Sequence, residues 1–202
     1  MVICLPNSDT ALILRCQERD PAAFDEIVAR YKQKIFNYVY RMVGDSDEAE
    51  DVTQDVFVKM YMSLASFRSE ASISTWLYRI AGNLCIDRYR KRTRREGAVG
   101  GEMVSLDAGA ETDSGERGAL EVPDHGSEPL RMLERGELDA QIQAALAKLP
   151  EKMRAVVVLH DIEGLAYEEI AAVEQCPLGT VKSRLFNARM QLRKLLTPYL
   201  QG

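Results

Sequence analysis

A pair of helical patterns near the C-terminus, separated by a tight turn, constrains the fold of this chain most. Residues 167–174 fit a short helix, Gln175-Cys176-Pro177 fit a turn, and a longer helix is predicted from near Leu178 to Leu196. In the longer segment, apolar residues recur at steps of four and three, which is typical of a helix with one buried face. They are Val181, Leu185, Ala188, Leu192 and Leu195. The arrangement predicts a helix-turn-helix.

The outer face of the second helix carries polar, aromatic and basic side chains. At about 100° per residue, the side chains that point away from the apolar stripe are Ser183, Phe186, Asn187 and Met190, with Lys182 and Arg193 beside them and Arg184 and Arg189 on the flanks. No carboxylate follows Pro177. Such a helix suits a DNA major groove, where Ser183 and Asn187 would meet base edges and Phe186 a thymine methyl. The alternative is an ordinary solvated helix of a bundle, which the short partner helix and Gly179-Thr180 at the turn disfavour.

Charge is segregated along the chain. The net charge is −5, but residues 96–134 alone carry −8, so the rest of the chain sums to +3 and DNA binding stays open. Residues 97–130 are rich in Gly, Ser, Asp and Glu and have no periodic apolar pattern, which predicts a linker. We therefore predict a domain at 1–95, a flexible acidic linker at 96–134, and a second domain at 135–202.

Both predicted domains show helical periodicity and no strand pattern. In the first, helices are expected over 9–19, capped by Ser8 or Asp9, from Pro21 to about Val43, from Asp45 to about Ser66, and from Ser72–Ser74 onward. In the second, one helix places Leu138, Ile142, Ala145, Leu146 and Leu149 on one side, and Pro150 opens another that ends at Gly164. The expected fold class is all-α, with two small helical domains.

Two charged surfaces in the first domain indicate binding to other molecules. The third helix carries Glu48, Asp51, Gln54, Asp55 and Lys59 on its outer side. A Mg²⁺ site there is disfavoured because no second acidic helix with a histidine accompanies it, so a solvated or protein-binding face is the better interpretation. Residues 88–95 hold six arginines and lysines, which suit a phosphate backbone; the alternative is a disordered basic tail.

The cysteines and histidines indicate neither a metal site nor a cofactor. Cys4, Cys16, Cys85 and Cys176 are widely spaced, and His125 and His160 lie at no metal-ligand spacing from them. Reduced thiols, together with the lack of a signal-peptide pattern or a membrane-length apolar run, predict a cytoplasmic protein. A redox role for Cys176 in the turn competes with a simple packing role.

Two segments together resemble the extracytoplasmic-function (ECF) class of bacterial RNA polymerase sigma factors. They are DEAEDVTQDVFVKMYMSLASFRSEASISTWLYRIAGNLCIDRYRK at 47–91 and LPEKMRAVVVLHDIEGLAYEEIAAVEQCPLGTVKSRLFNAR at 149–189. The resemblance implies a promoter-specificity subunit without catalytic residues, metal or cofactor. Its implied partners are core RNA polymerase, through the β′ clamp helices and the β flap, promoter DNA, and an anti-sigma factor.

The resemblance also implies roles for individual residues. The first domain would dock on polymerase through Asp51, Gln54, Asp55 and Phe57. It would open and capture the −10 element through Phe67, Arg68, Trp76, Arg79, Asn83, Arg88, Arg90 and Lys91. The second domain would read the −35 element through Thr180, Lys182, Ser183, Arg184, Phe186, Asn187 and Arg189. Many relatives carry Arg where this chain has Asn187, so the −35 preference is expected to differ, because Arg prefers guanine and Asn prefers adenine.

Two other classes of function compete with this interpretation. One is a free-standing helix-turn-helix regulator, which has no use for the second basic stretch at 88–95. The other is a nucleic-acid enzyme that uses Glu48, Asp51 and Asp55 with Mg²⁺.

Overall fold

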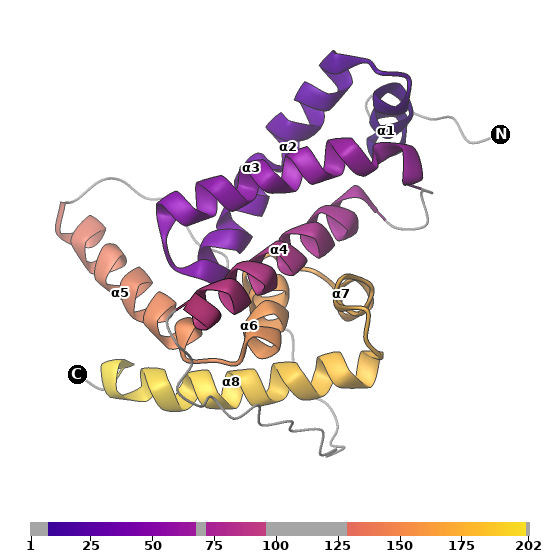
Figure 1. Cartoon of the computed structure of the whole chain (residues 1–202). Coiled ribbons are helices and arrows are strands. Elements are labelled where there is room, and N and C mark those ends of the chain that lie inside the picture. The colour runs from indigo at the N-terminus through magenta and orange to yellow at the C-terminus, as the bar shows by residue number, and fades with distance from the viewer. Residues whose placement is uncertain (1–7, 68–71, 96–128, 201–202) are drawn as a thin grey trace.

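The computed structural model describes residues 8–67, 72–95 and 129–200, and within them every regular element is helical (Figure 1). The first half contains α1 (Asp9–Gln17), α2 (Pro21–Val43), α3 (Ser46–Ser63), the short 3₁₀ turn η1 (Leu64–Ser66) and α4 (Ile73–Arg95). The second half contains α5 (Pro129–Ala147), α6 (Glu151–Val157), the π-helical turn η2 (Val158–Ile162), α7 (Tyr167–Glu174) and α8 (Leu178–Leu200). The predicted all-α architecture is confirmed.

Local capping residues set the boundaries of the first three helices. The Ser8 side chain accepts a hydrogen bond from the Ala11 amide, and the Asp20 side chain accepts one from the Ala22 amide, with Pro21 in the first turn of α2. Gly44 ends α2 at φ 86°, a left-handed conformation that glycine adopts without a Cβ clash. The predicted bounds of α2 are confirmed, whereas α1 ends at Gln17, before the predicted residue 19, and α3 ends at Ser63 and continues as η1.

The core of the first half lies between α2, α3 and α4. Figure 1 shows α3 lying beside α2 with α4 below them. The apolar side chains that α3 was predicted to turn inward, Ala49, Val52, Val56, Met60 and Leu64, are all buried. Tyr38 of α2 and Tyr78 of α4 meet edge to face at 5.4 Å between ring centroids, which adds a directional contact to this core.

The second half differs from its prediction in three places. Helix α5 begins at Pro129, inside the stretch predicted as linker, and residues 96–128 of that stretch lie outside the described residues. Leu138, which was expected to pack, is 50% exposed, whereas Ala145 and Leu146 further along α5 are buried. Helix α8 runs beneath α6 in Figure 1 and extends to Leu200.

The two halves contact each other through buried polar side chains at the C-terminal end of α2. Gln143 of α5 donates to the Tyr40 and Arg41 carbonyls at 3.1 and 3.2 Å. Arg154 of α6 donates to the Met42 carbonyl at 2.5 Å and to the Ala147 and Leu149 carbonyls at the end of α5. The Arg154 guanidinium therefore donates to carbonyls at the C-terminal ends of both α2 and α5. Its positive charge also interacts favourably with the dipoles of these helices.

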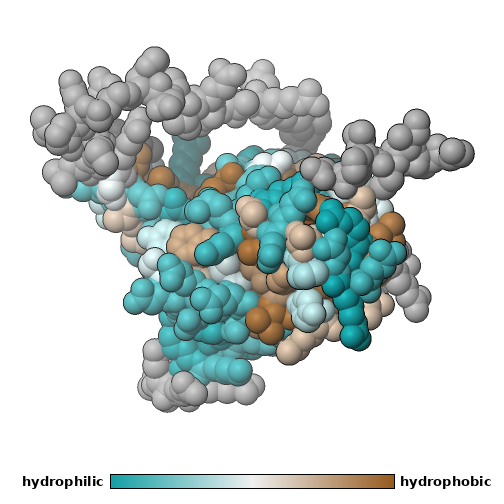
Figure 2. Space-filling model, turned by 90° about the horizontal axis from the view of Figure 1, so that it is seen from above, coloured by the Kyte–Doolittle hydropathy of each residue, from teal (hydrophilic) through white to brown (hydrophobic). Residues whose placement is uncertain are grey.

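The outer surface is mostly hydrophilic. On the face seen in Figure 2, hydrophilic residues predominate and hydrophobic ones are scattered among them. Among the described residues, no helix is long and apolar enough to cross a membrane.

Candidate nucleic-acid interface

Helices α7 and α8 form the predicted helix-turn-helix. The chain turns at Gln175, which has φ 51°, and the Cys176 amide donates to the Ala171 carbonyl at 3.2 Å. The Glu169 carboxylate accepts a hydrogen bond from the Ala166 amide at 2.9 Å and so caps the start of α7. Val181, Leu185 and Ala188 of α8 are buried, as are Ile170 and Val173 of α7. The apolar stripe thus holds the second helix against the first and leaves its other face free.

The free face of α8 presents the side chains expected to read DNA. Phe186 is 64% exposed and Met190 is 44% exposed, and Lys182 is exposed next to them. Ser183 and Asn187 are half-buried; the Ser183 hydroxyl donates to the Thr180 carbonyl at 3.1 Å. A protruding aromatic ring on a basic helix face is compatible with the bottom of a major groove.

The flanking arginines of α8 are held by carboxylates of the same half. The Arg184 guanidinium lies 4.0 Å from Glu174 and donates to the Cys176 sulfur at 3.6 Å, and its side chain is only 20% exposed. Arg189 donates from Nε and Nη2 to the two carboxylate oxygens of Asp161 in η2. Each of the two arginines is therefore paired with a carboxylate. The position of these arginines in the helical pattern could not predict this pairing.

Cys176 lies in the turn and touches Arg184. Burial raises the pKa of its thiol, more than the nearby Arg184 guanidinium lowers it. A raised pKa reduces the fraction of thiolate, which is the form that oxidants attack. The structure therefore favours the packing interpretation of this cysteine over a redox switch.

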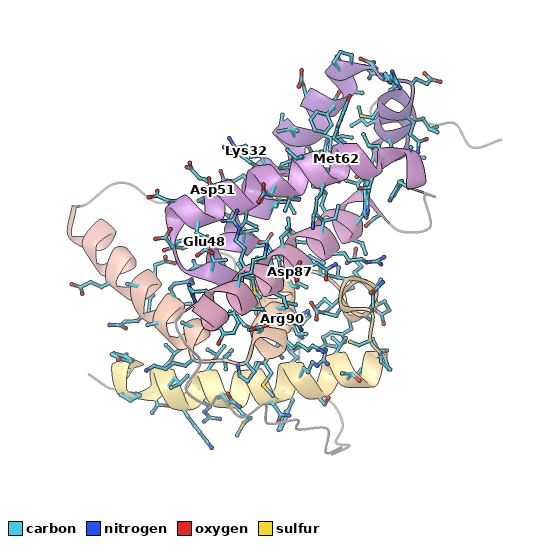
Figure 3. All side chains as sticks on the ribbon, viewed as in Figure 1. Lys32, Glu48, Asp51, Met62, Asp87 and Arg90 are labelled. Atoms are coloured by element: carbon cyan, nitrogen blue, oxygen red, sulfur yellow. The ribbon has the colours of Figure 1, made fainter. Side chains whose placement is uncertain are left out.

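The acidic face predicted on α3 is present, and it meets the basic stretch of α4. Asp51, Gln54 and Asp55 are exposed, and Figure 3 shows Glu48 and Asp51 near the N-terminal end of α3 and Met62 toward its other end. Arg88 of α4 lies 2.9 Å from Asp55 and 4.0 Å from Asp51, and Arg92 lies 3.8 Å from Glu48. Asp51 and Asp55, which are assigned to polymerase, thus share ion pairs with Arg88, which is assigned to DNA.

Phe57, one of the predicted polymerase contacts, is 7% exposed and packs in the core of the first half. The Mg²⁺ hypothesis also gains no support, since no cluster of three ligating side chains forms anywhere in the described part of the chain. Asp51 and Asp55 face an arginine instead.

Along α4, the residues assigned to the −10 element lie in different surroundings. The rings of Trp76 and Phe67 pack together at 4.5 Å between centroids, and both are partly buried. Arg79 donates to the Ala172 carbonyl of α7 at 2.7 Å, whereas Asn83, Arg90 and Lys91 are exposed. Figure 3 shows Asp87 and Arg90 on the second half of α4. Arg68 lies outside the described residues.

The basic stretch is helical. Helix α4 continues without a break to Arg95, so the alternative of a disordered basic tail does not hold for the backbone of 88–95. The backbone that carries these basic residues is therefore helical, so successive residues follow one another at about 100° around it.

Sequence reasoning missed the side chains that hold these surfaces in place. They are Gln143 and Arg154 between the halves, Asp161 beside α8, and Glu163, which accepts a hydrogen bond from the Tyr78 hydroxyl of α4 at 2.7 Å. Each partner lies far along the chain, so no local pattern could have indicated these contacts.

Comparisons with known proteins agree with this geometry. Residues 27–95 match the family model described as Sigma-70 region 2, and residues 139–192 match the one described as Sigma-70, region 4. The RNA polymerase sigma-H factor of Pseudomonas aeruginosa is 38% identical over 195 residues, covering 96% of this chain and 97% of that protein. The ECF RNA polymerase sigma factor SigW of Bacillus subtilis is 39% identical over 184 residues, covering 91% and 94%.

Solved structures show the same fold. CnrH, in a complex with the cytosolic domain of CnrY, aligns with a TM-score of 0.68 at 25% identity, covering 94% of this chain and 97% of that one. The sigma factor RpoE of Bartonella quintana, in a complex with the anti-sigma factor NepR, aligns with a TM-score of 0.62 at 25% identity, covering 86% and 96%.

Proposed function

Because this chain belongs to the ECF sigma factors of the sigma-70 family, we propose that it binds core RNA polymerase, directs it to specific promoters and helps melt the −10 region. It performs no covalent chemistry and acts in the cytoplasm, where polymerase and DNA meet. The observation that carries the proposal is the combination, in one chain, of an exposed acidic face on α3 and a helix-turn-helix whose outer face is basic and aromatic. A free-standing regulator needs only the second of these.

The acidic face serves as the polymerase-docking surface in this proposal. Asp51, Gln54 and Asp55 project from α3 with exposed side chains, which suits a basic or polar partner helix such as those of the β′ clamp. Phe57 supports this surface from inside the core. The β flap is expected to meet the second half.

The −10 surface is assigned to α4 and the segment before it. The packed rings of Phe67 and Trp76 offer a platform on which an unstacked base can lie, and such stacking contributes about 1–3 kcal/mol per base. Arg79, Asn83, Arg88, Arg90 and Lys91 follow on the same helix and supply contacts to bases and phosphates. Arg68 is assigned to the same element by its resemblance alone.

The −35 surface is assigned to α8. Lys182, Ser183, Phe186 and Asn187 face outward and are assigned to base edges and adjacent phosphates, with Thr180 at the helix start. Arg184 is assigned to phosphate, from a position where Glu174 and Cys176 orient its guanidinium.

A regulatory protein partner is also expected. CnrH and the Bartonella quintana RpoE were solved with the cytosolic domain of CnrY and with the anti-sigma factor NepR. An anti-sigma factor of comparable kind would act on this chain by covering its polymerase or DNA surfaces.

Reconstituted transcription tests the proposed function. Purified chain is mixed with core polymerase and a promoter library, and the start sites are mapped. We expect a defined set of start sites that core polymerase alone does not use. A chain that binds duplex DNA by itself but neither co-elutes with core polymerase nor creates start sites would be a regulator, and the proposal would be wrong.

A further inference from the structure

Arg189 is the only residue of α8 whose guanidinium forms a two-point pair with a carboxylate in the described part of the chain. Its Nε lies 3.1 Å from Asp161 Oδ2 and its Nη2 lies 2.5 Å from Asp161 Oδ1. The Arg189 side chain is 51% exposed and that of Asp161 is 34% exposed, so the pair lies at the surface beside the DNA-reading face. Paired N–H donors on both carboxylate oxygens give the most directional form of this contact.

The other exposed cations of α8 differ from Arg189. Lys182, Arg193 and Lys194 have no ion-pair partner among the residues that the structure describes. They can meet DNA phosphates with their full charge. The Arg189 guanidinium must first leave Asp161, which offsets its charge and occupies two of its donors. The hydrogen bond to Asp161 also raises the pKa of Arg189.

This difference matters because phosphate contacts set affinity for any sequence, while base contacts distinguish one sequence from another. Asp161 does not touch the base-reading side chains Lys182, Ser183 and Asn187. A carboxylate that occupies one flanking arginine therefore lowers the affinity for DNA of any sequence, while the contacts that read bases are left intact.

We infer that Asp161 sets the sequence-independent DNA affinity of the −35-reading half, because it withholds Arg189 from DNA phosphate. The inference rests on the proposed DNA-reading role of α8. It assigns a function to a carboxylate that lies outside the helix-turn-helix itself.

The salt dependence of binding tests the inference. The full-length chain is titrated with a fluorescent duplex of random sequence at several salt concentrations, and four forms are compared: wild type, Asp161→Asn, Arg189→Gln and the double variant. Asp161→Asn should bind more tightly and steepen the slope of log K against log salt by about 0.9, equal to one added phosphate contact. Between about 50 and 200 mM salt this corresponds to about a 3-fold larger loss of affinity.

The remaining variants separate this role from a structural one. Arg189→Gln should keep the wild-type slope, because its charge is already withheld, and the double variant should match Arg189→Gln. Glu137→Gln on α5, an exposed carboxylate with the same charge change, should leave the slope unchanged and so controls for net charge. Thermal melting of each variant identifies any that misfold.

Two results would overturn the inference. One is a shallower slope for Arg189→Gln alone, which would mean that Arg189 reaches phosphate while Asp161 is present. The other is an unchanged slope for a folded Asp161→Asn variant. Neither measurement uses polymerase or a promoter, so failure here is distinct from failure of the chain to direct transcription.

Discussion

Glu174 lies at the junction of α7 and the turn, where its carboxylate is largely buried and 4.0 Å from Arg184. Burial raises its pKa above the ordinary value of 4.5, although Arg184 and Lys152 act in the opposite direction. The folded chain therefore binds this proton more tightly than the unfolded chain. In the pH range upward from about 4.5, the group makes the free energy of unfolding decrease as pH rises.

Replacing Glu174 removes this titration. We expect Glu174→Gln to flatten the fall in melting temperature as the pH rises above about 4.5, because the variant has no charge to bury. The check is thermal unfolding across that range. Glu168→Gln changes an exposed carboxylate of the same helix and should keep the wild-type profile. A Glu174→Gln profile parallel to wild type would show that burial does not control this carboxyl group.

Asn187 tests base reading at the level of one side chain. An asparagine pairs best with adenine, and an arginine pairs best with guanine O6 and N7. We expect Asn187→Arg to move the preferred base at its contact from adenine toward guanine, with a discrimination of about 1–3 kcal/mol. Competition among −35 variants for the holoenzyme measures this shift. A uniform gain in affinity for all sequences would instead place residue 187 on the phosphates.

Helices α3 and α4 share an ion-pair network, and this links the two surfaces that the first half is proposed to use. Arg88 of α4 lies between Asp51 and Asp55 of α3. A polymerase surface that attracts these carboxylates competes with Arg88, and a DNA phosphate that attracts Arg88 competes with the carboxylates. Because each ligand removes a competitor of the other, their binding should be mutually favourable.

Asp55→Asn should therefore have opposite effects on the two ligands. Association with core polymerase should weaken by about 2–5-fold, the range expected for one exposed charge. Affinity of the free chain for random duplex should rise, because Arg88 loses its closest carboxylate. Both are measured by titration, with Asp25→Asn on α2 as a control for charge. Loss of both affinities in a folded variant would contradict the shared network.

The boundaries of α2 were predictable because their causes are local. Asp20 and Pro21 start α2 and Gly44 ends it, and each acts within one turn of its own position. The outer face of α8 followed equally from the spacing of Val181, Leu185 and Ala188, since a helix that buries one stripe must expose the other.

Contacts between distant elements were not predictable in the same way. Gln143 donates to carbonyls that lie 103 and 102 residues earlier in the chain. In the helical pattern of the sequence, it cannot be told from any surface glutamine. Phe57 was assigned to a partner by resemblance, and only the packing of α3 against its neighbours shows that it is buried. Asp161 and Arg189 are likewise 28 residues apart, with no periodicity to relate them.

The two halves of the molecule pack against each other in this structure, through α7 on α4 and α5 on α2. We call this arrangement closed. The contact has a functional consequence, because Arg79 of the proposed −10 surface donates to the Ala172 carbonyl and Tyr78 donates to Glu163. In this arrangement α7 therefore occupies one donor of Arg79. If the proposed −10 role of Arg79 needs that donor, separation of the halves at α4 and α7 should favour engagement of the −10 element.

Gln143 offers a selective way to weaken this closure, because its amide bonds only to residues of α2: it donates to the Tyr40 and Arg41 carbonyls and accepts from the Arg41 side chain. We expect Gln143→Ala to lower the free energy that favours contact between the two halves by about 1–2 kcal/mol. The fraction of molecules in which the halves are apart should then rise by about 5–30-fold. Small-angle X-ray scattering should then give a larger radius of gyration. Gln141→Ala, on the same helix, removes a glutamine with no bond to α2 and should keep the wild-type radius.

If opening limits access to Arg79, Gln143→Ala should also bind single-stranded −10 DNA more tightly, and Arg79→Ala should abolish that gain. An unchanged radius in a folded Gln143→Ala chain would show that other contacts hold the halves together.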